Sequence, residues 1–146
     1  MTDLGNAGLL RRLGALLYDL LVVTALLMLA GFAAIRYTGG EAVPAGTPWF
    51  QAMLIIVVAT FFCGFWMTGG QTIGMRAWRL RLITDDADGN VVSLATALIR
   101  FAAACLSLLP LGLGFLWILI DRRRLTWHDR LSGTRVVRLP KPRRHS

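Results

Sequence analysis

Apolar residues gather in long runs along this chain. The first run extends from Leu13 to Ile35 with Asp19 as its one charged residue, and the second extends from Phe50 to Met67 with none. A helix needs about 20 mainly apolar residues to cross about 30 Å of hydrocarbon. Neither run shows the polar face of a helix on the surface of a soluble protein. The two runs therefore predict two full transmembrane helices.

A third run extends from Leu94 to Ile120 and is interrupted near its middle by Pro110, with glycines just after it. Proline removes a backbone donor from a helix, and glycine permits a turn. The run is too short for two full spans. It predicts either a hairpin of two shorter helices that enters the membrane part-way and returns, or a single kinked crossing. The hairpin is favoured because it keeps the basic tail on the same side as the N-terminus.

Two segments between and after these runs predict a small sheet. Arg79–Thr84 alternates in polarity with period two, and Gly133–Leu139 is a second candidate strand. The expected fold is therefore an all-α membrane protein with a short cytoplasmic β-ribbon. We expect residues 1–139 to form a single membrane domain, and residues 140–146 to form a disordered basic tail.

The distribution of charge predicts an orientation. The chain has 16 Lys and Arg residues and a net charge of +8, with nine of the basic residues between Arg122 and Arg144. Basic residues gather on the cytoplasmic side of membrane proteins. We therefore expect a multi-pass protein of the cell (inner) membrane, with its N-terminus in the cytoplasm and the Arg36–Trp49 loop outside. Anionic lipids are the expected contact of the basic face. Nucleic acid is not expected, because topology already accounts for the charge.

The sequence shows none of the common catalytic, metal-binding or phosphate-binding motifs. We find no Ser–His–Asp spacing, metal-ligand cluster or phosphate loop, so we expect no enzyme, no cofactor and no metal. The segment Asp85–Asn90 is similar to a calcium loop, but its glycine is out of register and no bidentate Glu follows.

The charges inside the apolar runs are the candidate functional residues. An Asp at the centre of a span costs about 2.5–3.5 kcal/mol, and such groups usually have a partner. Asp19 lies six residues past Leu13, and Arg100 lies six residues past Leu94. Their equal depth predicts an Asp19–Arg100 ion pair, which either locks helix packing or forms a cation or proton path. Arg12 lies two turns before Asp19 on the same face and marks the membrane interface.

Three further titratable residues lie at the predicted cytoplasmic end of the third run. Asp121 ends this run, and His128 and Asp129 follow in the segment "WHDRL". His128 is either a pH-sensitive group at the mouth of a path or a capped interfacial residue.

Four motifs in this order resemble the RDD family of bacterial membrane proteins, which is named for one Arg and two Asp. They are "RLGALLYD", "GGQTIGMR", "ALIRF" and "WHDRLSGTRVV". The resemblance covers about residues 10 to 139. It implies that Arg12 and Asp19 are the first two signature residues and that Asp129, rather than Asp121, is the third.

The second of these motifs contains Gln71 and Gly74, which we treat as secondary site residues. Relatives often have Lys where this chain has Met75. The resemblance implies transport of an undefined ligand, and cation/proton exchange for some members.

These features lead to two hypotheses of function. The first is a transporter of a small cation or proton that uses a buried Asp–Arg pair. It would be a homo-oligomer, because one copy has too few spans to enclose a path. The alternative is a non-transport scaffold or accessory protein whose buried charges fix the fold.

Overall fold

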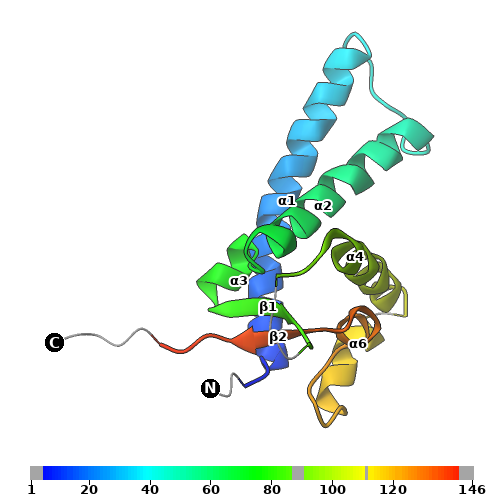
Figure 1. Ribbon diagram of the computed structural model, residues 1–146. Coiled ribbons are helices and arrows are strands. Elements are labelled where there is room, and N and C mark those ends of the chain that lie inside the picture. Colours follow the sequence, from blue (N-terminus) through cyan, green and yellow to red (C-terminus); the bar gives the residue numbers. More distant parts are fainter. Residues whose placement is uncertain (1–4, 87–90, 111, 142–146) are drawn as a thin grey trace, which may run out of the picture.

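A long helical hairpin rises from a compact base in the computed structural model, which describes residues 5–86, 91–110 and 112–141 (Figure 1). The hairpin consists of α1 (Leu9–Tyr37) and α2 (Pro48–Thr68), and its connecting loop lies at the end far from the other elements. Both helices are long and apolar enough to cross a membrane, with mean hydropathies of 2.2 and 2.0 over an 18-residue stretch of each. The two predicted long apolar helices are therefore confirmed.

The inner face of α1 is a narrow stripe that carries charge. Arg12, Ala15, Asp19 and Val23 are buried, at the spacing of three and four residues that places side chains on one helix face. Most other large side chains of this helix are exposed. The helix begins at Leu9, before the apolar run, and so Arg12 is held within it.

The base contains a two-stranded antiparallel sheet. Strands β1 (Leu80–Thr84) and β2 (Thr134–Arg138) pair along their full length, with Thr84 opposite Thr134. The predicted β-ribbon is confirmed. The N-terminal segment lies along the other edge of β2, where Ala7 N donates to the Val136 carbonyl at 2.9 Å. This third segment of the same polypeptide supports a two-stranded ribbon whose stability would be marginal by itself.

The third apolar run is divided into short helices. It forms α4 (Leu94–Leu108), then α5 (Leu113–Leu116) and the 3₁₀ turn η1 (Trp117–Leu119). An added Cβ on Gly114 would lie 2.5 Å from Ser107 Cβ, so α5 packs tightly against the end of α4. The break occurs where Pro110 was expected to cause it. The membrane hairpin, with a single kinked crossing as its alternative, stays a prediction.

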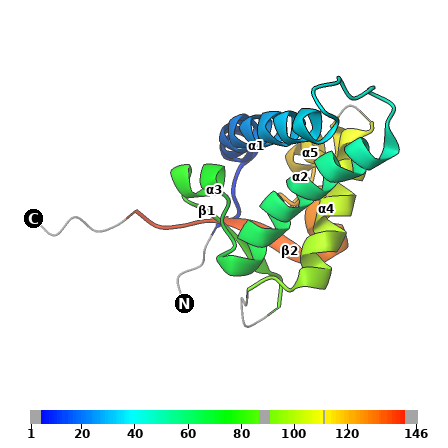
Figure 2. The ribbon, with the colours of Figure 1, turned by 90° about the horizontal axis from the view of Figure 1, so that it is seen from above.

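The last helix, α6 (Trp127–Ser132), packs against α4 and leads directly into β2. Figure 2 shows α2 between α1 and α4, in agreement with the contacts of α2 with both helices. Two sequence predictions lie largely outside the described residues. They are the basic tail, of which residues 142–146 are not described, and the segment Asp85–Asn90 that is similar to a calcium loop, of which residues 87–90 are not described.

A short helix, α3 (Ile73–Ala77), joins the hairpin to the sheet and lies directly against α1. An added Cβ on Gly74 would lie 1.9 Å from the carbonyl oxygen of Ala15. Real Cβ atoms do not approach backbone atoms so closely, and backbone moves less easily than a flexible side chain. Glycine at this position therefore allows α3 and α1 to touch.

We expect Gly74→Ala to destabilise the protein by about 2–4 kcal/mol, because the new methyl group must push α3 away from α1. Thermal unfolding of the purified protein in detergent measures the effect. The matched control is Gly64→Ala in α2, where an added Cβ meets nothing within 4 Å. This control should be neutral or slightly stabilising. Equal melting temperatures for the two variants would contradict the proposed contact.

Candidate functional site: a buried charge cluster beside a cavity

Asp129 lies at the start of α6, where local sequence fixes its side chain. The four residues T-W-H-D from Thr126 form a capping box, in which the Thr126 backbone N–H donates to Asp129 Oδ2 at 3.2 Å. Such a box satisfies backbone donors that the first turn of a helix would otherwise leave unpaired. The Asp129 carboxylate is therefore held in one orientation, and its side chain is fully buried.

Two arginines from different helices meet on this carboxylate. Arg12 Nη1 of α1 lies 2.6 Å from Asp129 Oδ2, and Arg100 Nη1 of α4 lies 2.5 Å from Asp129 Oδ1. Both arginine side chains are almost fully buried. Each carboxylate oxygen thus accepts a charge-assisted hydrogen bond, which is stronger than one between neutral groups.

Further contacts hold each arginine in place. Arg12 Nε donates to the Ala7 carbonyl at 3.2 Å, in the segment that flanks β2. Arg100 Nη1 also donates to Thr134 Oγ1 at 2.9 Å, and its guanidinium lies 5.2 Å from the centre of the Trp66 ring. The cluster thereby connects α1, α2, α4, α6 and β2.

The charges of the cluster follow from its surroundings. Burial alone would raise the pKa of Asp129, but the charges of Arg100 and Arg12 hold that pKa well below its usual value. Burial, together with the charge of Arg100, lowers the pKa of His128 to about 3. Near neutral pH, Asp129 is therefore ionised and His128 is neutral.

The predicted Asp19–Arg100 pair is wrong. Arg100 binds Asp129, whereas Asp19 accepts hydrogen bonds from the Thr72 hydroxyl at 2.5 Å and from the Gly74 backbone N–H at 2.8 Å. Equal depth along two helices did not determine which groups face each other. Among the residues that the structure describes, no basic side chain lies within ion-pair distance of Asp19.

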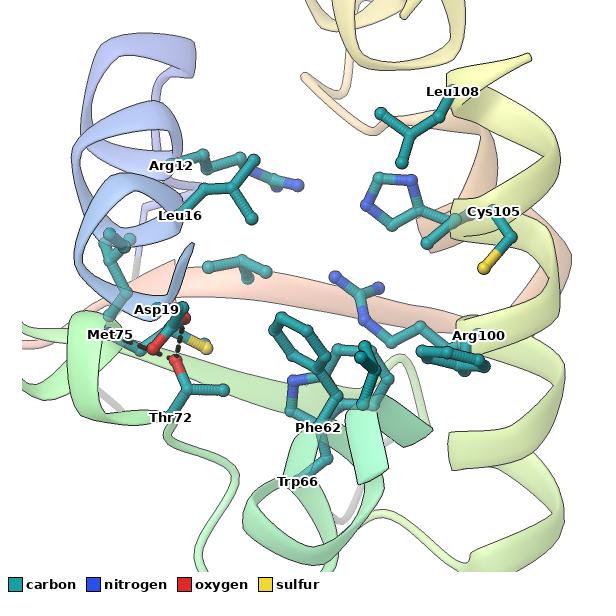
Figure 3. Close-up of a pocket in the computed structure, with 17 residues that line it drawn as sticks. Arg12, Leu16, Asp19, Phe62, Trp66, Thr72, Met75, Arg100, Cys105 and Leu108 are labelled. Carbon is teal, nitrogen blue, oxygen red and sulfur yellow. Dashed lines mark hydrogen bonds between the residues drawn. The ribbon is translucent and has the colours of Figure 1, made fainter. Parts of the chain in front are cut away.

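Asp19 and the arginines nevertheless share one cavity of about 230 Å³. Figure 3 shows Arg12 and Asp19 entering from α1 on one side and Arg100 from α4 on the other. Thr72 and His128 also line it, and most of the remaining wall is apolar. The structure therefore brings the sequence-predicted residues Arg12, Asp19, Arg100 and His128 to one space, with Asp129 just behind the arginines.

The other predicted residues lie elsewhere. Gln71 Nε2 donates to the Leu80 carbonyl at 2.7 Å and fastens the α2–α3 connection to β1. Asp121 accepts from the Leu125 backbone N–H at 2.9 Å and forms an ion pair with Arg130. These bonds lower the pKa of Asp121. Neither residue is part of the charge cluster.

Sequence reasoning missed the neutral partners of these charges. Thr72, Thr126 and Thr134 are buried and bond to Asp19, Asp129 and Arg100, respectively. The capping box at Thr126 could have been found from its spacing to Asp129. No comparable signal identifies Thr72 or Thr134, because their roles depend on contacts distant in sequence.

The fold is mainly helical, and its two long apolar helices, together with the family assignment that follows, suggest a membrane protein. The chain belongs to the RDD family, whose family model matches residues 6–133. The resemblance noted in the four sequence motifs is therefore confirmed. No curated protein and no solved structure matches this chain.

We expect Asp129→Asn to cost about 3–5 kcal/mol in unfolding free energy, because the change leaves two buried guanidinium groups without their counter-charge. Chemical or thermal unfolding in detergent measures it. The control is Asp85→Asn, whose side chain is about half exposed and lies 3.9 Å from Arg135. Loss of such a surface pair should change stability by less than about 1 kcal/mol. Equal effects of the two changes would contradict a central role for Asp129.

The neutral His128 makes stability depend on pH. Its pKa of about 3 in the folded state lies below its value of about 6.5 in an unfolded chain. The unfolded state therefore binds more protons between these values, and stability falls as the pH is lowered from 6.5. The expected slope is at most about 1.4 kcal/mol per pH unit.

The depressed pKa of Asp129 adds a further loss only below about pH 4. The difference between wild type and His128→Gln in melting curves from pH 6.5 to 4.5 therefore isolates the effect of His128. His128→Gln should flatten the profile in this window. A wild-type profile that is already flat there would show that the imidazole is not buried in its neutral form.

Proposed function

We propose that this RDD-family protein is a transporter of the inner membrane that moves a solute coupled to protons, with Asp19 as the group that carries the proton. The observation that carries the proposal is the setting of Asp19. It lines the cavity, and its bonding partners are the neutral Thr72 hydroxyl and the Gly74 amide. Intramembrane carboxylates commonly belong to proton or ion paths.

Asp19 suits this role better than Asp129. Protonation of Asp129 would leave two arginine cations facing each other in a buried site, which is strongly unfavourable. Protonation of Asp19 breaks no ion pair among the described residues, and the Thr72 hydroxyl can exchange donor and acceptor roles with a protonated carboxyl. Asp129 is accordingly proposed as the fixed charge and Asp19 as the variable one.

The finer membrane topology is part of the proposal. The loop of the hairpin and the sheet lie at opposite ends of α1 (Figure 1). The basic residues at the sheet end support a cytoplasmic N-terminus by the positive-inside rule. Two long helices cannot enclose a path, so we propose a homo-oligomer in which the exposed apolar side chains of α1 and α2 face lipid or a second copy.

The two arginines that line the cavity affect which solutes it can accept. A bare alkali cation entering the cavity would meet Arg12 and Arg100 as well as Asp19. The resemblance implies cation/proton exchange, but the test below does not assume it and compares cations with a small organic anion.

A non-transport scaffold is the second candidate. It is favoured by the way in which the cluster around Asp129 connects five elements, α1, α2, α4, α6 and β2, since that arrangement stabilises a fold without moving anything. In a transporter Asp19 carries the proton, whereas in a scaffold it contributes only to the stability of the fold.

Proteoliposomes with an internal pH dye test the proposal. An imposed gradient of Na⁺, K⁺ or a small organic anion should drive proton movement through the wild type. Asp19→Asn should reduce this movement to the leak of empty liposomes while the protein still elutes as a folded particle. The control is Thr24→Val, an exposed position on the same helix, which should transport normally.

Transport by Asp19→Asn at the wild-type rate would refute the role of this carboxylate. A wild type that moves protons with none of these solutes, while Asp19→Asn lowers only the yield of folded protein, would favour the scaffold.

A further inference from the structure

The cavity is mainly apolar, and a few polar groups enter it, so its lining describes a ligand. Arg12, Arg100 and Thr72 are among these polar groups. Leu16, Val58, Phe62, Cys105 and Leu108 supply apolar surface around the remainder. In Figure 3 the two guanidinium groups reach toward the centre from opposite sides. Sites of this kind select a molecule that combines an apolar body with a few placed polar groups.

Arg100 has hydrogen-bonding capacity that the protein does not use. Its Nη1 serves Asp129 and Thr134, but its buried Nε has no hydrogen-bond partner among the described residues. A buried donor without a partner destabilises the empty site. Because Arg100 lines the cavity, this unused capacity belongs to a guanidinium group that a bound anion would meet.

Charge balance specifies a single negative charge. Asp129 neutralises one of the two arginines, and an ionised Asp19 would neutralise the other, so the empty site can be neutral. An arriving monoanion would upset this balance unless Asp19 takes up one proton. With the anion and the proton both bound, the site is neutral again, whereas a dianion would leave an excess of negative charge.

We propose that this cavity binds a small monocarboxylate with an apolar body, and that the anion and a proton on Asp19 bind together. The second half rests on the proposed function, whereas the first half does not. The volume of about 230 Å³ sets the size of the ligand. A dry cavity of about 150 Å³ holds benzene, so a carboxylate of roughly six carbons fits.

Titratable groups around Asp19 are few. Arg12 faces the cavity from α1, Arg100 and Cys105 face it from α4, and His128 faces it from α6. Residues that α2, α3 and the sheet contribute to the described lining carry no charge. Because His128 is neutral near pH 7 and arginine does not titrate, the proposal assigns the pH dependence of binding to the Asp19 carboxyl group, which Asp19→Asn tests directly.

Thermal shift and calorimetry on the purified full chain in detergent test binding without any flux. Hexanoate should raise the melting temperature, whereas hexylammonium and hexanol, which share its apolar body, should not. Ala104→Phe places a ring in the cavity and should weaken hexanoate binding by at least about tenfold. The control is Ala102→Phe on the exposed face of the same helix, which should bind as the wild type does.

Alkylation of Cys105 reports where the ligand lies. Cys105 lines the cavity and is exposed, whereas Cys63 is buried and lies outside the described lining. Hexanoate should slow the reaction of Cys105 with a maleimide, measured by mass spectrometry, and hexylammonium should not. This measurement stands even if Ala104→Phe proves unstable.

Coupling to the proton has its own readout. Wild-type affinity for hexanoate should fall as the pH rises from 6 to 8, because the ligand and the proton stabilise each other's binding. Asp19→Asn, which mimics the protonated state, should bind hexanoate equally well across this range. A flat wild-type profile would overturn the coupling.

Equal responses to hexanoate, hexylammonium and hexanol, or unprotected Cys105 at saturating hexanoate, would overturn the binding site itself. Proton movement with another solute in proteoliposomes would then still support the proposed function. The two failures are therefore distinguishable.

Discussion

One carboxylate with two guanidinium groups is the interaction on which the structure depends. Asp129 accepts hydrogen bonds from Arg12 of α1 and Arg100 of α4, and its own orientation is fixed by the capping box of α6. Removing two arginines and an aspartate from water is costly, and only close geometry with further hydrogen bonds compensates for it. The bonds to Ala7 and Thr134 supply that compensation and align the sheet with the helices.

The cluster leaves one positive charge beyond what Asp129 neutralises, and this excess gives the neighbouring cavity its character. Asp19 lies on the far wall, held by neutral donors and by the close approach of α3, which glycine at position 74 permits. A fixed ion pair and a carboxylate that forms no ion pair with any described residue thus lie beside the same space. The first stabilises the fold, and the second is available for chemistry.

Much of this arrangement could be predicted from the chain, but not the pairing. Two long apolar runs, a proline in the third run and two candidate strands, one of them alternating in polarity, predicted the two long helices, the break and the ribbon. The Asp19–Arg100 pair failed because depth along a helix says nothing about rotation around its axis. The capping box at Thr126 was a readable local signal that placed Asp129 at a helix start. The partners Thr72 and Thr134 carried no such signal, since their contacts form only in the folded chain.

The separation of Arg12 from Asp129 along the chain, 117 residues, has a consequence for biosynthesis. The ribosome delivers both long helices and Arg100 before it delivers Asp129, which joins the two arginines. Until α6 is made, neither guanidinium group has this counter-charge, and burying it unpaired would be costly. Strand β2, which follows α6, then pairs at its other edge with the N-terminal segment. Assembly of the base therefore waits for α6 and β2, and a chain interrupted before them lacks both the carboxylate and the strand that join its parts.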